Sequence, residues 1–226
     1  QNGVHPRAAV EGRLNLVTAK ATTSDPLPGS TGEGDDNIQS YSYRLCLTDD
    51  PANRRPLAAP PPGYARERFA PILLPPAEKE RLPLPFHHRF LIYSLREMVE
   101  REHIFHGHAL PNRKRSWNAT NLTGAGKGYP AADAAGRRAI AEAHREHALG
   151  LLWFLQNDPE MPPDLREQAR PWGLARDEFP ETDNFPPQLY VREARRLVGR
   201  AVFTEHDALA PPPPAPAAAR AAVCHP

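Results

Sequence analysis

Cysteine is scarce in this chain. Only Cys46 and Cys224 occur among 226 residues, which is too few for the four-cysteine sites that hold iron–sulfur clusters or structural zinc. A disulfide between them is not expected, because Cys224 falls in a tail that is nearly all alanine and proline. The sequence therefore excludes a disulfide scaffold and any metal centre built from cysteine.

Long apolar runs and an excess of charge are also missing. No apolar run is long enough for a transmembrane helix. The 28 lysines and arginines nearly cancel the 27 aspartates and glutamates, and a net charge of +1 creates no field that would recruit nucleic acid or a membrane. No signal-peptide pattern is visible, so the compartment stays open, with a soluble cytoplasmic protein favoured over an exported one.

Proline, in contrast, is abundant at 28 residues, and it clusters. Because proline lacks an N–H donor and fixes φ, these clusters mark connections between secondary-structure elements. The clusters lie at 26–29, 59–63, 74–86 and 211–216.

The first expected element is a strand over residues 37–48, where side chains alternate in character. One face should be buried and the other partly polar. The first face carries Tyr41, Tyr43, Leu45 and Leu47, and the second carries Ser42, Arg44 and Cys46.

Apolar spacing predicts helices further along. A helix over 88–102 should run into a short strand over 104–110. The clearest helix covers 134–157, with Asp133 as its N-cap and Asp158-Pro159 as its stop. A short helix near 163–170 follows.

Histidines His144 and His147 lie on the apolar stripe of the expected 134–157 helix, with Leu151 and Leu155. We expect both to be core residues. His103, His106 and His108 are close in sequence, but no carboxylate or cysteine completes a metal set at a familiar spacing, so we assign no metal ligands. A histidine-based metal enzyme using His106, His108, His144 or His147 remains the weakest alternative.

Five segments together carry a resemblance to a known family. They are YRLCLTDDP at 43–51, ALPNRK at 109–114, LLWFLQNDP at 151–159, WGLARDEF at 172–179 and QLYVREARRLVG with RAVFTEHD at 188–207. In this order they resemble FAD-dependent oxidoreductases related to the flavoprotein subunit of heterodisulfide reductase.

The resemblance implies an α+β fold, the substrate or cap region of a flavoprotein. Its mixed, partly antiparallel sheet would carry 37–48, 104–110 and 188–203, with flanking helices. Periodicity leaves 188–203 ambiguous between helix and strand; the resemblance favours an extended segment, followed by a helix capped by Thr204. Residues 172–179 alone suggest an irregular loop.

The resemblance also implies FAD as cofactor and hydride transfer from a small substrate. Arg192, Arg195 and Arg196 would bind the cofactor, because guanidinium is planar, permanently charged and suited to an anionic or electron-rich partner. Structural ion pairs with Glu193 are the alternative. Asn112, Arg113 and Lys114, and more weakly Arg44, would bind substrate; a solvated turn is the alternative for the first three.

The dinucleotide-binding fingerprint of such proteins is not found. GSTGEG at 29–34 and GAGKG at 124–128 lack the strand-before, helix-after context and are expected to be loops. We therefore expect residues 1–207 to be the substrate-side part of a flavoprotein that lacks its N-terminal FAD-binding portion. Residues 208–226 should be disordered, through truncation or frameshift. A non-catalytic module for a carbohydrate or carboxylate is the main alternative.

Overall fold

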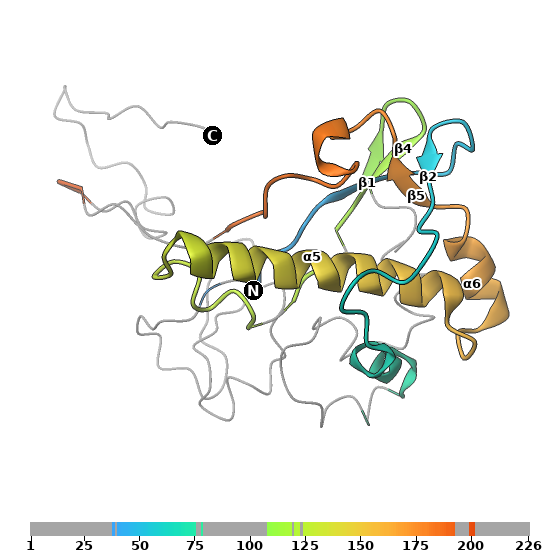
Figure 1. Cartoon of the computed structure of the whole chain (residues 1–226), viewed down its shortest axis with the longest axis horizontal. Helices are drawn as coiled ribbons and strands as arrows, with labels where there is room; N and C mark the ends of the chain where they lie inside the picture. Colours follow the sequence, from blue (N-terminus) through green and yellow to red (C-terminus); the bar gives the residue numbers. More distant parts are fainter. Residues whose placement is uncertain are drawn as a thin grey trace, which may run out of the picture.

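The computed structural model describes residues 38, 40–75, 78, 108–118, 120–122, 124–192 and 199–201. Within these ranges a small sheet lies beside one long helix, as Figure 1 shows. The α+β class expected from the sequence is confirmed. No helix in these ranges is long and apolar enough to cross a membrane.

The sheet has five strands in the order β2-β5-β1-β4-β3. All pairings between these described strands are antiparallel. Its central strand β1 pairs Leu45 with Trp117 on one side and Leu47 with Leu174 on the other. The strands are β1 (Leu45–Thr48), β2 (Arg54–Arg55), β3 (His108–Leu110), β4 (Lys114–Trp117) and β5 (Gly173–Ala175).

The strand expected over 37–48 is present in shortened form. Only β1 forms a ladder, although Ser42 makes an isolated antiparallel bridge with Tyr190. The side chains of Tyr41, Tyr43, Leu45 and Leu47 are buried, as their alternation predicted. The strand expected over 104–110 is found at β3, whose preceding residues lie outside the described part.

The expectation of an irregular loop over 172–179 was wrong for its first half. Gly173–Ala175 forms β5, which is buried and lies between β1 and β2. Gly173 permits this close approach, because a Cβ at that position would lie 2.6 Å from the carbonyl oxygen of Arg55. Three residues are too few to show an alternating pattern, so no strand could be predicted here from the sequence.

The long helix α5 (Ala134–Asn157) has the predicted boundaries. The Asp133 side chain accepts a hydrogen bond of 2.7 Å from the backbone N–H of Gly136, which makes it a true N-cap. Asp158 ends the helix with an extended ψ of 130°. The predicted short helix is present as α6 (Pro163–Ala169).

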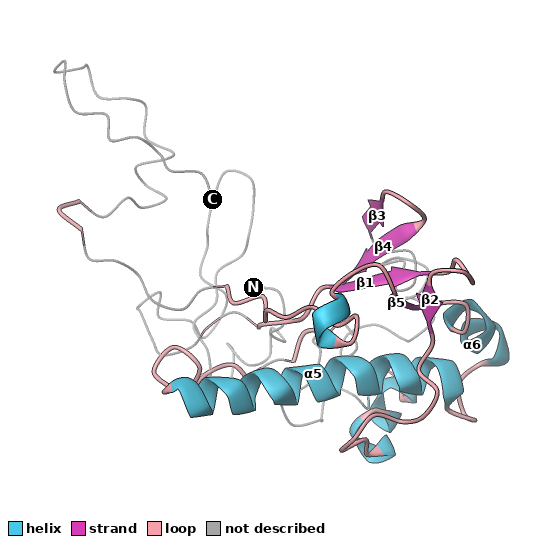
Figure 2. Ribbon diagram, turned by 45° about the horizontal axis from the view of Figure 1, so that its top comes forward, coloured by secondary structure: helices cyan, strands magenta, loops and turns pink. Residues whose placement is uncertain are grey.

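One face of α5 packs on the sheet and contributes to a single core (Figures 1 and 2). Leu151, Leu155 and Phe154 of the helix are completely buried. His144 and His147 are buried as well, which confirms their assignment to the core. From the sheet side the core contains Tyr41, Tyr43, Leu45, Leu47, Trp117 and Leu174.

A second contact on α5 is made by two short 3-10 helices, η1 (Arg66–Arg68) and η2 (Ala70–Leu73). Phe69 joins them and stacks near His147, with ring centroids 5.6 Å apart. The approach needs a glycine on α5, since a Cβ at Gly150 would lie 2.6 Å from the ring of Phe69.

The C-terminal expectations are only partly covered. After η3 (Pro180–Thr182), the chain reaches Tyr190, whose backbone N–H donates to the carbonyl of Ser42 at 2.9 Å. Within the described part of the segment expected to be extended over 188–203, Tyr190 forms one β-bridge, with Ser42. The helices expected over 88–102 and after Thr204, and the tail 208–226, lie outside the described residues.

Candidate functional site

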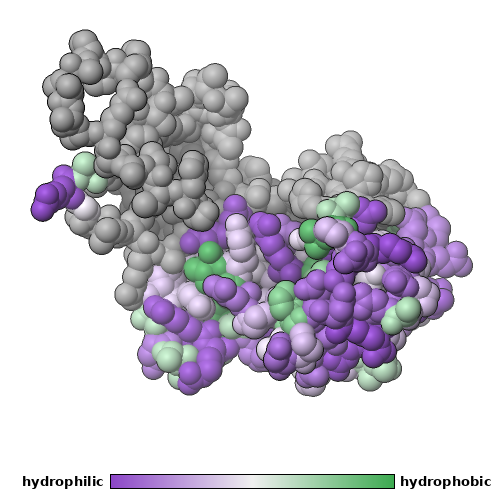
Figure 3. Space-filling model, turned by 90° about the horizontal axis from the view of Figure 1, so that it is seen from above, coloured by the Kyte–Doolittle hydropathy of each residue, from purple (hydrophilic) through white to green (hydrophobic). Residues whose placement is uncertain are grey.

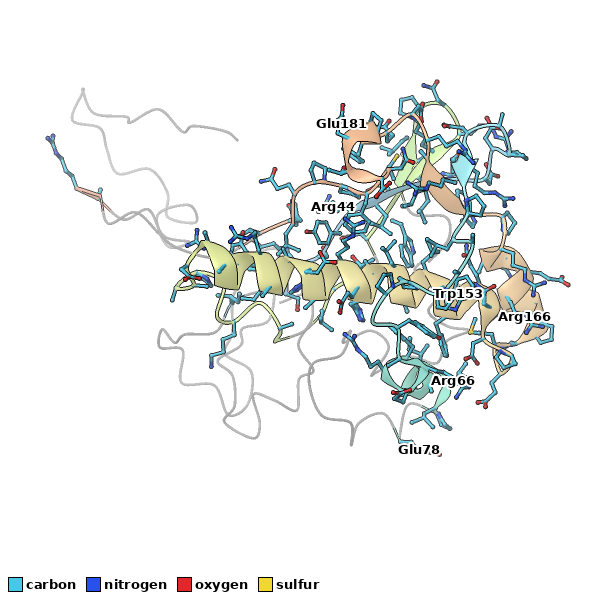
Figure 4. The ribbon with its side chains drawn as sticks, viewed as in Figure 1. Arg44, Arg66, Glu78, Trp153, Arg166 and Glu181 are labelled. Atoms are coloured by element: carbon cyan, nitrogen blue, oxygen red, sulfur yellow. The ribbon has the colours of Figure 1, made fainter. Side chains whose placement is uncertain are left out.

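Arg44 is held in a defined position at the start of β1. Alternation places it between the buried residues Tyr43 and Leu45 but on the opposite side of the chain, where it is exposed. Its guanidinium carbon lies 4.1 Å from the ring centroid of Tyr190. Such a cation–π contact restrains a long flexible side chain, and Figure 4 shows Arg44 between α5 and the segment that bears Glu181.

A hollow of ≈ 370 Å³ opens beside this pair. Its volume lies in the range of small-ligand pockets, roughly 300–1,000 Å³. Arg192 follows the wall residue Val191 directly and is half-buried. The hollow is lined by Arg44, Pro186, Gln188, Leu189, Tyr190 and Val191.

The structure therefore places Arg44 beside the segment that leads to Arg192, although the two lie far apart in the sequence. Arg195 and Arg196 lie outside the described residues. Tyr190 is the site residue that sequence reasoning missed; it is 44 % exposed, although it lies within an apolar stretch. The described surface seen in Figure 3 is largely hydrophilic with small apolar patches.

Asn112 and Arg113 lie in the tight turn between β3 and β4. Both have left-handed backbone conformations, with φ of 59° and 57°. The Thr48 hydroxyl donates to the carbonyl of Arg113 at 3.0 Å, and the Arg113 side chain lies 3.2 Å from the Asp49 carboxylate. Both residues lie in a turn with their side chains exposed.

Lys114 differs from its two neighbours because it is buried. Its Nζ lies 2.7 Å from Asp177 and 2.6 Å from Glu178, and these hydrogen bonds raise its pKa. The same contact lowers the pKa of Asp177. The two carboxylates come from the segment after β5, so the charge of Lys114 is already balanced inside the protein. Sequence reasoning missed this partner set, because a separation of more than 60 residues gives no local signal.

Arg44 and the turn lie at opposite ends of β1. Thr48 pairs with Lys114, whereas Arg44 precedes Leu45 at the other end of the strand. Four residues of extended chain span about 13 Å. One small substrate would not contact both ends, so the four substrate-binding candidates form two groups.

Replacement of Lys114 by methionine should lower the free energy of unfolding by about 1–2 kcal/mol, because the hydrogen bonds of a charged donor are lost while its stem is kept. The loss is moderated because the two carboxylates remain partly exposed, at 51 % and 36 %. Urea unfolding would measure the change. Arg113→Met, which removes an exposed pair, is the control and should cost less than about 1 kcal/mol. Equal effects of the two variants would contradict the assignment of Lys114 to the interior.

Cys46 offers no nucleophile. It is buried and free, and burial is the main cause that raises the pKa of its thiol to about 11. A thiol with such a pKa is protonated at neutral pH and reacts poorly.

The described residues form neither a phosphate-binding loop nor a metal cluster. The GAGKG segment at 124–128 forms consecutive turns, as expected, and the nearest helix N-terminus is already capped by Asp133. No group of three potential metal ligands occurs in the described ranges, which omit His103, His106 and the side chain of His108.

A family model described as FAD dependent oxidoreductase matches residues 4–223. No curated protein and no solved structure matches the chain.

Proposed function

This chain belongs to the FAD-dependent oxidoreductase family, and from that premise we propose that it contributes the substrate side of a flavoprotein that oxidises a small molecule. FAD is the cofactor of the family. Bound FAD would supply the hydride-accepting chemistry, while residues of the protein would orient the substrate and balance charge. The match over residues 4–223 is the observation that carries the proposal.

The described residues offer suitable groups for one part of FAD. The exposed guanidinium of Arg44 over the Tyr190 ring offers planar cationic donors to an anionic or electron-rich group, and the half-buried Arg192 follows two residues after Tyr190. A cradle of backbone N–H groups for the pyrophosphate is a different requirement, and no described glycine-rich turn leads directly from a strand into a helix. The described residues therefore suit contact with the flavin or the substrate, and they lack a cradle for the pyrophosphate.

We assign the roles within this chain accordingly. Arg192, Arg195 and Arg196 would hold the cofactor by balancing negative charge. Arg44 would orient a polar or carboxylate substrate at the hollow beside Tyr190. Asn112 and Arg113 lie at the other end of β1, about 13 Å away, and form the alternative substrate contact. Lys114 would act on substrate only indirectly, since its Nζ already lies within 2.7 Å of Asp177.

We propose that the pyrophosphate of FAD binds to an N-terminal dinucleotide-binding unit outside these 226 residues, because the residues that resemble the family are those of its substrate side. Flavin absorbance at about 350–500 nm should be present in a purified full-length protein and absent from the purified 226-residue chain. Tight FAD binding by these 226 residues alone would contradict this part of the proposal.

In a full-length protein that binds FAD, Arg192→Ala and Arg196→Ala should lower flavin retention or turnover by about tenfold or more. The loss of one charge-assisted hydrogen bond, about 1.5–3 kcal/mol, explains this magnitude. Stability should change far less, as followed by thermal unfolding of the apoprotein. Arg200→Ala is the matched control, because Arg200 is an exposed arginine of the same segment. If both variants behaved like this control, the arginines would be structural.

A further inference from the structure

A second hollow, of ≈ 480 Å³, lies between the middle of α5 and the segment after η3. In Figures 1 and 2 this segment passes over the helix. The hollow shares only Pro186 with the one beside Arg44. Its walls are Tyr43, Arg138, Ala139, Ala141, Glu142, Arg145, Thr182, Phe185, Pro186 and Pro187.

The apolar part of the wall is rigid. Tyr43 and Phe185 are buried and meet edge to face, with ring centroids 4.7 Å apart. The Thr182 hydroxyl donates to the carbonyl of Phe185 at 2.6 Å, which fixes the chain that carries this ring. A flat apolar body would find a preformed surface here.

The charged part of the wall carries two positive side chains and one negative side chain. Arg138, Glu142 and Arg145 lie on one side of α5 at helical spacing. Both arginines lie within one helical turn of Glu142, which offsets one of the two positive charges, so the wall keeps a net positive charge. The guanidinium carbon of Arg145 lies 4.8 Å from the ring centroid of Phe185.

We propose that this hollow binds a small planar carboxylate, with the carboxylate group on Arg145 and the apolar body against Phe185 and Pro186. A guanidinium restrained by stacking on a ring presents its fork of N–H donors at little entropic cost and matches a carboxylate bidentately. The site goes beyond the proposed flavin chemistry, and it stands whether or not the chain binds FAD.

The composition of the wall favours a carboxylate with an apolar body over a free inorganic anion. The wall contains two alanines, two prolines and a phenylalanine, which an inorganic anion would leave without a partner. Tyr43 adds a hydroxyl that can donate a hydrogen bond to either kind of anion.

Calorimetric titration of the whole chain with benzoate at pH 7 tests the proposal. We expect saturable binding at one site, weakened at least about tenfold by Arg145→Gln, because a bidentate charged contact is lost. Arg145→Lys keeps the charge and most of the stem, and should give an intermediate loss. Glu142→Gln should strengthen binding, since it removes a nearby like charge.

Lys127→Gln removes one exposed positive charge elsewhere and is the matched control, with unchanged affinity expected. Circular dichroism would establish that each variant is folded. The proposal is overturned if benzoate shows no saturable binding in the millimolar range, or if benzyl alcohol or inorganic phosphate binds as tightly. It is equally overturned if Arg145→Gln and Arg145→Lys bind benzoate as well as Lys127→Gln does.

Discussion

Replacement of His147 by leucine should make the protein markedly more resistant to acid. His147 is only 7 % exposed, and burial, followed by the nearby charge of Arg68, lowers its pKa from 6.5 to about 3. Between pH 6.5 and pH 3 the imidazole of His147 is protonated in the unfolded chain but neutral in the folded chain. Folding stability is therefore lost as the pH falls from about 6.5 towards 3. Each pH unit within this window corresponds to about 1.4 kcal/mol, so the loss between pH 6.5 and pH 4 approaches 3 kcal/mol.

Leucine has no proton to take up, so the variant should lose about 3 kcal/mol less than the wild type between pH 7 and pH 4. At pH 7 the substitution should be neutral or mildly stabilising, because Nε2 of His147 has no partner among the described residues. Urea unfolding at both pH values measures the difference. His144→Leu is a useful comparison: Nδ1 of His144 lies 2.8 Å from the Ile140 carbonyl, which opposes the lowering of its pKa by burial. Parallel stability curves for wild type and His147→Leu would contradict the prediction.

Replacement of Asp158 by alanine should destabilise the protein by about 2–4 kcal/mol, as expected when a buried, hydrogen-bonded carboxylate is removed. Its side chain is 2 % exposed and accepts two hydrogen bonds from Arg66, of 2.6 and 3.0 Å, with a third from the backbone N–H of Glu160. Its carbonyl also accepts a hydrogen bond of 3.2 Å from Arg166. Figure 4 shows Arg66 and Arg166 near the C-terminal end of α5. Through these hydrogen bonds, Asp158 links η1 and α6 to the end of α5.

The control for Asp158→Ala is Glu160→Ala. Glu160 contacts the same arginine at 3.0 Å, but its side chain is 68 % exposed, so its removal should cost at most about 1 kcal/mol. Thermal or urea unfolding of both variants gives the comparison. Similar losses in the two variants would show that the contact with Arg66, and not the burial of Asp158, determines the effect.

The sequence determined the elements whose signals are local. A capping aspartate, an apolar stripe and an Asp-Pro stop are enough to define α5 from Ala134 to Asn157, and the stripe also placed His144 and His147 in the core. Alternation predicted that Tyr41, Tyr43, Leu45 and Leu47 are buried, but Ser42 and Cys46 of the opposite face are buried as well. The family was also recognisable from the sequence, because each of the five segments that resemble it is continuous in the chain.

The tertiary structure decided what depends on residues far apart in the sequence. Gly173–Ala175 is a strand because β1 and β2 pair with it on both sides, not because of its own three residues. Lys114 is buried because the chain brings Asp177 and Glu178 to it from beyond α5. Arg44 meets Tyr190 through a single bridge at Ser42. Local propensity is encoded over a few neighbouring residues, whereas pairing, burial and charge compensation arise only when the whole chain has folded.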